Sequence, residues 1–491
     1  MEFVFGLALG AIVVGLLFYR KRTRPTSPSG PVVVRPSSSG KPGREDSNVR
    51  DRQLALQLME SATPFLFVHG RAGTGKSQLL REWKRTTRRK KAIVAFTGIA
   101  AVNVDGRTIN SYFRFPPRAL DQFVLGQRIA DVRAGERQLY RALETIVVDE
   151  ISMVRSDMWG AMDAFLRAVR ESSKPFGGVQ VIVLGDLFQL PPVVTNRDES
   201  QFLHDNFGGK YFFSTRDDSA PLPTMIELEH SYRHMNDPWW DNCLRHLREG
   251  RGSEADLERI NSRVNPCDGD VPPDGFVALT GTNDRADAIN DRALANLPGR
   301  QFVSEGVATG AFENMAEEQL PAVRRLRLKA GAPVMFLVND NEGRWVNGTT
   351  GVVRGIREGI VQVSVMGAAR ETPYDVSRFT WKLKRQRYNQ QANQIVEHVD
   401  GEFTQYPLAL AWAFTIHKSQ GKTIRNVFVD LERGAFEAGQ LYVALSRCPT
   451  LDSLRLQSPI SMKDARVDPV VVEYLDRLRQ RQNAQDLTTG R

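Results

Sequence analysis

The chain has 491 residues, which is too long for one compact core, so we expect about two to four domains. Its composition, with 41% hydrophobic and 25% charged residues, is not that of a disordered or fibrous chain. Its three cysteines lack the spacing of a zinc site, so we expect a reducing compartment and no structural metal. The net charge of +9 favours a polyanionic partner, although a basic membrane-proximal tail would give the same sign.

The N-terminus carries an apolar run of 17 residues, from Phe3 to Tyr19, with a basic cluster at 20–24 directly after it. Such a run is just long enough to span a bilayer as a helix, and the basic cluster is expected to stay cytoplasmic. A cleaved signal peptide would carry its positive charge before the apolar run, where this chain has Glu2. We therefore predict an uncleaved anchor at 1–22, a flexible Ser/Pro/Gly-rich linker at 23–48, and catalytic domains in the cytoplasm.

A short apolar strand at 64–68 leads into Gly70-Arg71-Ala72-Gly73-Thr74-Gly75-Lys76-Ser77. This GxxxxGKS pattern, followed by a helical pattern at 78–84, is typical of a phosphate-binding loop. Its glycines let backbone N–H groups surround the phosphates, while Lys76 reaches the β- and γ-phosphates and Ser77 binds Mg²⁺. ATP is therefore the predicted cofactor, with Mg²⁺ beside it.

Two further apolar strands end in polar groups suited to nucleotide hydrolysis. The strand at 145–148 is followed by Asp149, which we expect to bind Mg²⁺, and by Glu150, which we expect to orient the attacking water. The strand at 179–184 runs into Gln189, which can sense the γ-phosphate through a hydrogen bond or can be a polar residue of a Pro-Pro turn. The carboxyl ends of parallel strands meet at one edge of a sheet, so these groups are expected to lie together.

These segments, with further motifs at 96–101, 106–111, 228–233, 415–423 and 442–447, closely resemble superfamily-one helicases of the 5′-to-3′ branch, the Pif-one/RecD-like group. The resemblance covers about residues 50–457. It implies an α/β fold with two RecA-like domains and ATP between them. The implied layout is a first domain at 49–205 with a wedge insertion at 117–144, a second domain at 206–300 and 406–460, an SH3-like β-barrel at 301–405, and a tail at 461–491.

The resemblance also implies roles for individual residues around ATP. Arg233 and Arg447 would act as arginine fingers from the second domain, although arginines are more commonly structural. Gln53 stands where the family places an adenine-reading glutamine, with Gln57 as a competitor. The expected nucleotide-binding set is Gln53, Gly70, Arg71, Ala72, Gly73, Thr74, Gly75, Lys76, Ser77 and Gly421.

A second set is expected to grip DNA through contacts that ignore base sequence: Thr97, Asn110, Phe115, His417, Lys418 and Ser419. Three of these expectations have alternatives or departures. His417 could face the core, Phe115 and Phe113 could be core aromatics, and Asn110 stands where the family usually has histidine. Arg425 replaces a residue that is usually acidic in the family, and the arginines of the insertion could simply be a solvated helical face.

The predicted function is an ATP-dependent 5′-to-3′ DNA helicase and single-stranded DNA translocase, acting on duplex junctions in replication, repair or recombination. A monomeric motor held at a membrane is expected. The alternatives are a nucleic-acid-stimulated ATPase that acts as a clamp, an RNA helicase, and a kinase, for which no acceptor site is evident.

Overall fold

The computed structural model describes residues 44–488 except 117–118, 216–220, 268–270, 318–319, 341, 346, 366–371, 390–393 and 433. The predicted anchor at 1–22 lies outside these residues. Helix α2 spans Arg44–Glu60, so the last five residues of the linker predicted to reach residue 48 are helical. Among the described helices, none combines the length and apolar character needed to cross a membrane.

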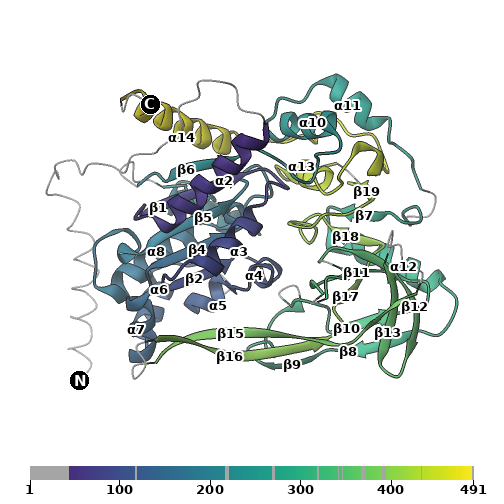
Figure 1. Cartoon of the computed structure of the whole chain (residues 1–491), viewed down its shortest axis with the longest axis horizontal. Coiled ribbons are helices and arrows are strands. Elements are labelled where there is room, and N and C mark those ends of the chain that lie inside the picture. The colour runs from purple at the N-terminus through teal and green to yellow at the C-terminus, as the bar shows by residue number, and fades with distance from the viewer. Residues whose placement is uncertain are drawn as a thin grey trace. The chain divides into compact units, whose positions relative to one another are not determined.

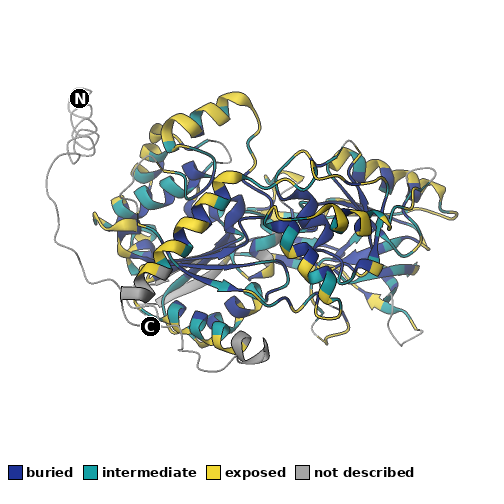
Figure 2. Ribbon diagram, turned by 90° about the horizontal axis from the view of Figure 1, so that it is seen from above, coloured by how far each residue is buried: buried dark blue, intermediate teal, exposed yellow. Residues whose placement is uncertain are grey.

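A six-stranded parallel sheet forms the part of the chain expected to be the first RecA-like domain (Figure 1). Its central strands are continuously buried and rich in Val, Ile and Leu, as expected for a parallel sheet with helices on both faces. Figure 2 shows these buried strands beneath helices with exposed outer faces. In order across the sheet, the strands are β3 (Arg107–Thr108), β2 (Lys91–Ala95), β4 (Thr145–Asp149), β5 (Gln180–Gly185), β1 (Phe65–Gly70) and β6 (Thr224–Leu228).

Strand pairing and core packing place two segments in the first domain that were predicted to lie outside it. Strand β6 pairs in parallel with β1, so the first domain continues past residue 205 to about residue 228. Helix α14 (Pro469–Thr488), predicted as a tail without evident role, buries Val471, Tyr474, Leu475 and Leu478 in the core of this domain. Strand β6 joins the sheet and α14 joins its hydrophobic core, in both cases through contacts between residues far apart in the chain. The other helices of the domain are α3 (Lys76–Thr86), α4 (Gly98–Asn103), α5 (Ile109–Phe113), α8 (Ser156–Arg170) and α9 (Arg197–Phe207).

The predicted insertion at 117–144 contains two short helices, α6 (Gln122–Ala130) and α7 (Ala134–Ala142). Asp121 caps α6 by accepting the N–H of Val124 at 2.8 Å. Tyr140 of α7 is 1% exposed and joins the core of the first domain. The insertion is therefore anchored by packing.

The second RecA-like domain holds a four-stranded parallel sheet in the order β18 (Ala413–Thr415), β7 (Val277–Thr280), β19 (Val427–Asp430) and β20 (Leu454–Leu456). The domain is thus assembled from segments on both sides of an insertion. The insertion was predicted to end at residue 405, but it extends to about residue 410, because β17 (Leu408–Leu410) pairs with β11 (Pro333–Phe336) of its sheet. Its helices are α10 (Pro238–Arg248), α11 (Glu254–Asn261), α12 (Asn283–Asn296) and α13 (Gln440–Leu445).

The insertion between these halves is made of antiparallel strands, as predicted. Its largest sheet has the order β14 (Tyr374–Val376), β13 (Ile360–Val365), β12 (Thr350–Arg357), β11 (Pro333–Phe336) and β17 (Leu408–Leu410). Smaller sheets pair β8 (Phe302–Glu305) with β10 (Arg325–Leu328), and β15 (Phe379–Asn389) with β16 (Gln394–Gln405) and β9 (Val307–Gly310). The long β15–β16 ribbon reaches α7 of the first domain (Figure 1).

Candidate nucleotide and nucleic-acid site

The phosphate-binding loop connects β1 to α3 and is closely fitted to its surroundings. Gly73 and Gly75 both have φ of 82°, a left-handed conformation that favours glycine. A Cβ on Gly73 would come within 2.7 Å of the Cβ of Arg233, so the loop lies directly against a segment of the second domain. No side chain caps the start of α3, which leaves its first N–H groups available to an anion.

Lys76 lies at the centre of a cluster of acidic groups. Its ammonium donates to the carbonyls of Gly70 at 2.5 Å and Arg71 at 3.1 Å. Burial lowers the pKa of Lys76, while the nearby carboxylates of Asp186, Glu150 and Asp149 oppose that shift. The lysine thus lies beside both acids of the β4 edge, where a phosphate would replace the carbonyls as its partner.

Asp149 ends β4, and Glu150 follows it in a strained conformation. Glu150 has φ of 52° and ψ of 49°, which is unusual for a residue other than glycine and typical of functional sites. Burial, with Glu150 as the next cause, raises the pKa of Asp149 to about 7. Burial likewise raises the pKa of Glu150, which Lys76 and Arg447 counteract. Two adjacent carboxyl groups, Asp149 buried and Glu150 half-buried, therefore line this edge of the site, with Lys76 and Arg447 as nearby positive charges.

Gln189 and Gln420 join the two RecA-like domains over this acidic pair. Gln189 is 6% exposed, and its side-chain carbonyl accepts a hydrogen bond from Gln420 at 3.1 Å. Gln420 also donates to Glu150 at 3.4 Å. The next residue, Gly421, would place a Cβ 3.8 Å from the Glu150 carboxylate. Gln420 belongs to the 415–423 motif, but its motif alone did not indicate this role.

Arg233 and Arg447 lie side by side at the same cleft. Arg233 donates to the Thr423 hydroxyl at 2.9 Å and to the Ser446 carbonyl at 2.8 Å. Burial and then the neighbouring Arg447 lower the pKa of Arg233 to about 9. Arg447, which is 1% exposed, donates to the carbonyls of Val443, Ser419 and Lys422 and to the Ser446 hydroxyl. These acceptors are all neutral. The buried Arg447 lies close enough to Glu150 to lower the pKa of that carboxyl, whereas Arg233 is half-buried beside Arg447.

Asp186 connects the loop to the second domain and was also not assigned a role from the sequence. Its carboxylate accepts hydrogen bonds from Arg248 at 3.0 Å and from the Tyr442 hydroxyl at 3.1 Å. The Tyr442 oxygen in turn accepts the N–H of Ala72 at 3.0 Å. Although burial alone would raise the pKa of Asp186, Arg248 and His69 hold it well below its usual range. Asp186 therefore stays charged and positions the loop.

The expected adenine region lies between α2 and the 228–233 segment. Gln53 and its competitor Gln57 are both exposed on α2. The Tyr232 ring approaches the Cβ position of Gly75 to 3.5 Å and is 47% exposed, so its face can meet a base. The Arg52 guanidinium lies 3.7 Å from the same position. Neither residue was assigned a role from the sequence, although Tyr232 belongs to the 228–233 motif.

Arg71, expected to contact the nucleotide, is engaged elsewhere. Its guanidinium forms a bidentate pair with Asp241 at 2.7 and 2.9 Å and donates to the Glu229 carbonyl at 2.8 Å. Its side chain therefore ties the loop to α10.

Of four residues expected to grip DNA, Thr97, His417 and Lys418 lie in loops that follow strands, and Asn110 lies on α5. Thr97 caps α4 by accepting the N–H of Ala100 at 3.1 Å, and Asn110 donates to the Pro116 carbonyl at 3.2 Å. Lys418 is exposed, while His417 is half-buried, and burial lowers the pKa of His417. Neutral His417 beside a cation fits hydrogen bonding to a phosphate or sugar.

Two expected DNA contacts are corrected by burial. Phe115 is 4% exposed, stacks on Phe113 with ring centroids 5.2 Å apart, and meets Phe165 edge to face. Ser419 is 1% exposed, and its hydroxyl donates to the Ile416 carbonyl at 2.7 Å. Phe115 is thus a core aromatic, the alternative left open by the sequence, and Ser419 shapes its loop instead of presenting a hydroxyl.

Phe115→Ala is expected to destabilise the first domain by about 3–5 kcal/mol, because it removes a buried aromatic side chain and leaves a cavity. Urea unfolding measures the loss, and fluorescence anisotropy measures affinity for single-stranded DNA at a temperature where the variant is folded. The DNA affinity of the folded variant should match that of the wild type. A large loss of DNA affinity with unchanged stability would contradict this placement.

The raised pKa of Asp149 predicts a pH-dependent stability. Without nucleotide and Mg²⁺, folding favours protonated Asp149, because the pKa is about 7 when folded and near 3.8 when unfolded. The stabilising contribution is therefore complete below pH 4 and is lost as the pH rises to 7, with an upper limit of about 4 kcal/mol. The free energy of unfolding of the wild type, minus that of Asp149→Asn, should fall between pH 4 and 7 and then level off. A difference that rises would refute the assigned shift.

Comparison with known proteins places these features in a family context. A family model described as PIF1-like helicase matches residues 48–212. The ATP-dependent DNA helicase Pif1 of Bdellovibrio bacteriovorus is 32% identical over 429 residues, which are 86% of this chain and 90% of that protein. Human ATP-dependent DNA helicase PIF1 is 33% identical over 425 residues, which are 84% of this chain and 61% of the human protein.

Solved structures agree with this similarity. The crystal structure of Bacteroides sp. Pif1 in complex with ADP-AlF4 matches with a TM-score of 0.78 at 28% identity, covering 88% of this chain and 97% of that one. Bacteroides Pif1 bound to single-stranded DNA matches with a TM-score of 0.64 at 29% identity, covering 89% and 98%.

Proposed function

This chain belongs to the PIF1-like helicase family, and on that premise we propose that it is an ATP-driven motor that moves along single-stranded DNA and unwinds duplexes. The observation that most strongly supports this function is a nucleotide site with walls from both RecA-like domains. Lys76 and Glu150 lie on one wall, and Gln420 and Arg447 lie on the other. Its relatives are named as ATP-dependent DNA helicases, which supports the reaction and the substrate.

The two walls suggest how hydrolysis produces movement. Backbone N–H groups of the loop and Lys76 bind the phosphates, Glu150 orients a water molecule, and Arg233 and Arg447 stabilise charge on the transferred phosphoryl group. Because ATP attracts groups from both domains, its binding favours closure of the cleft and its loss favours opening. DNA-binding loops on the two domains then approach and separate in turn.

Mg²⁺ fits the acidic edge of this site. Ser77 and Asp149 would hold the ion, which would neutralise charge on the β- and γ-phosphates. Among the described residues, no group of three or more His, Cys, Asp or Glu side chains is arranged to hold a metal. A site with one carboxylate and one hydroxyl is what Mg²⁺ uses when nucleotide phosphates complete its shell.

We propose movement in the 5′-to-3′ direction, in DNA replication, repair or recombination, with the α6–α7 insertion as the duplex-splitting wedge. The test compares ATP-dependent unwinding of duplexes with 5′ and 3′ single-stranded tails, using the full chain in detergent. Unwinding of the 5′-tailed duplex alone is expected. Unwinding only from a 3′ tail would reverse the direction, and DNA-stimulated ATP hydrolysis without unwinding from either tail would favour a clamp. Stimulation by RNA but not by DNA would favour an RNA helicase.

We also propose that the apolar segment at 3–19 anchors the motor in a membrane with the catalytic domains in the cytoplasm. The support is the length of the apolar run and the basic cluster that follows it. The protein should remain in the membrane fraction after alkaline extraction, and a chain lacking residues 1–22 should not. An intact chain that alkaline extraction releases would contradict an anchor.

A further inference from the structure

Phe436 is a large aromatic side chain held in an exposed position. It follows β19, and its ring is 57% exposed. Its backbone N–H donates to the side-chain carbonyl of Gln440 at 3.0 Å, and Gln440 is 0% exposed. Its carbonyl accepts a hydrogen bond from Arg466 at 3.3 Å. The backbone is therefore fixed on both sides, so the ring is presented by an ordered loop.

The Phe436 loop meets other loops at the carboxyl edge of the second sheet. The ring edge lies 3.0 Å from the position that a Cβ on Gly281 would occupy, just after β7. The next residue, Glu437, is close enough to oppose the lowering of the His417 pKa, and His417 follows β18. Three strand ends thus converge on this ring. Ligands of open α/β sheets bind outside the carboxyl ends of the strands.

The acidic groups near Phe436 are neutralised by partners. Glu437 pairs with Lys210 at 3.2 Å, and Glu432 lies 3.7 Å from Arg285. Asp464 accepts the N–H of Ala435 at 2.9 Å and the N–H and hydroxyl of Ser461 at 2.8 Å. These pairings reduce the negative charge that would repel a polyanion.

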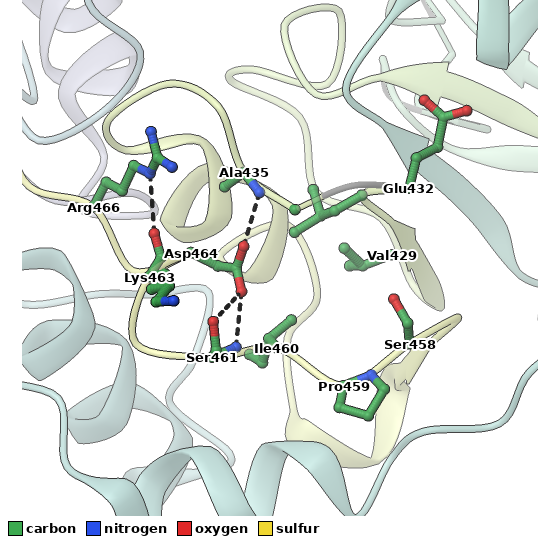
Figure 3. Close-up of a pocket in the computed structure, with 12 residues that line it drawn as sticks. Val429, Glu432, Ala435, Ser458, Pro459, Ile460, Ser461, Lys463, Asp464 and Arg466 are labelled. Carbon is green, nitrogen blue, oxygen red and sulfur yellow. Dashed lines mark hydrogen bonds between the residues drawn. The ribbon is translucent and has the colours of Figure 1, made fainter.

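Two exposed cations lie beside the backbone of the Phe436 loop. Lys463 and Arg466 line a hollow of about 410 Å³ together with Ala435, the residue before Phe436 (Figure 3). Figure 3 shows their side chains at one side of this hollow, with the Asp464 carboxylate directed to backbone and hydroxyl groups. An exposed aromatic face beside cations matches the chemistry of one nucleotide, since the ring can stack on a base while the cations bind phosphate.

We propose that Phe436 is a stacking platform for one base of single-stranded DNA as the strand crosses the second RecA-like domain. This inference rests on the proposed function, because it assumes that DNA passes the His417–Lys418 loop. Lys463 and Arg466 bind the phosphates that flank the stacked base. Since every base has an aromatic face, the platform grips DNA without reading its sequence.

The test measures affinity for a hairpin with a single-stranded 5′ tail, whose junction fixes the register of the strand. Phe436→Ala and Phe436→Leu should each weaken binding by about 5- to 100-fold, the usual effect of losing one base–aromatic stack. Phe436→Trp should retain binding, because it keeps an aromatic face. The apolar control Val470→Ala, at an exposed position on α14, should leave binding unchanged. ATP hydrolysis without DNA should be the same in all of these proteins.

A series of tails with one abasic nucleotide at each position then locates the contact. One position should weaken wild-type binding and have no effect in Phe436→Ala. Equal binding by wild type, Phe436→Ala and Phe436→Leu, in a protein that unwinds DNA, would overturn the platform and leave the helicase function intact. A wild type that neither binds nor unwinds DNA would instead defeat the proposed function. Loss of binding without any abasic position that depends on Phe436 would also overturn direct stacking.

Discussion

Lys76→Ala is expected to abolish ATP turnover, lowering kcat by at least about 100- to 1,000-fold, the usual effect of removing one group that stabilises transition-state charge. Lys76 is the cation of the loop that lies near the acidic residues Asp149, Glu150 and Asp186, since the other one, Arg71, is paired with Asp241. Without it, negative phosphates would enter an acidic cluster with only the arginines of the other wall to offset the repulsion. Phosphate release with saturating single-stranded DNA measures the effect.

The matched control for this variant is Lys84→Ala, on the same helix. Lys84 pairs with the exposed Asp105 at 2.7 Å on the surface, so its loss should change turnover less than twofold. Binding of single-stranded DNA without nucleotide should remain near the wild-type value in both variants, which shows that the chain has folded. Turnover by Lys76→Ala within tenfold of the wild type would remove Lys76 from the catalytic set.

Glu150→Gln is expected to retain ATP binding while slowing hydrolysis by about 100- to 10,000-fold, the range for losing a general base or a group that orients water. The amide keeps the shape of the side chain and can still contact Gln420, but it cannot polarise a water molecule. The strained backbone at φ of 52° directs this side chain toward the loop and should be unaffected by the substitution. Single-turnover hydrolysis and binding of a fluorescent ATP analogue measure the two effects separately.

Glu144→Gln provides the control, since Glu144 is exposed and lies just before the same strand. It should hydrolyse ATP at the wild-type rate. If Glu150→Gln cycles normally, another group orients the water and the role assigned to Glu150 is wrong. Loss of ATP binding together with hydrolysis would mean that Glu150 shapes the pocket.

Local sequence is sufficient to predict the strands and the loop that form the phosphate-binding site. The apolar strands before Gly70 and Asp149 were predicted because continuous Val, Ile and Leu runs are typical of buried parallel strands. The loop followed from glycine spacing, because positive φ at Gly73 and Gly75 is a property of those residues themselves. The antiparallel insertion was likewise visible in alternating residues and glycine turns.

Contacts between distant segments could not be read in this way. Strand β6 and helix α14 join the first domain through pairings with β1 and with its core, and neither carries a local signal for its partner. The local sequence around Phe115 is compatible with either a solvent-facing or a core position. Its packing against Phe113 and Phe165 shows that it lies in the core. Gln420 and Asp186 acquire their roles from residues more than fifty positions away.

The nucleotide-binding loop, the acidic strand end and the family can be recognised from the chain alone, because each depends on residue types at fixed spacing. The tertiary structure alone decided which side chains of the second domain meet that loop, where Phe115 lies, and that Phe436 is presented at the edge of a sheet. The physical reason is that burial and the distance between charges depend on how segments pack, and packing is a property of the whole fold.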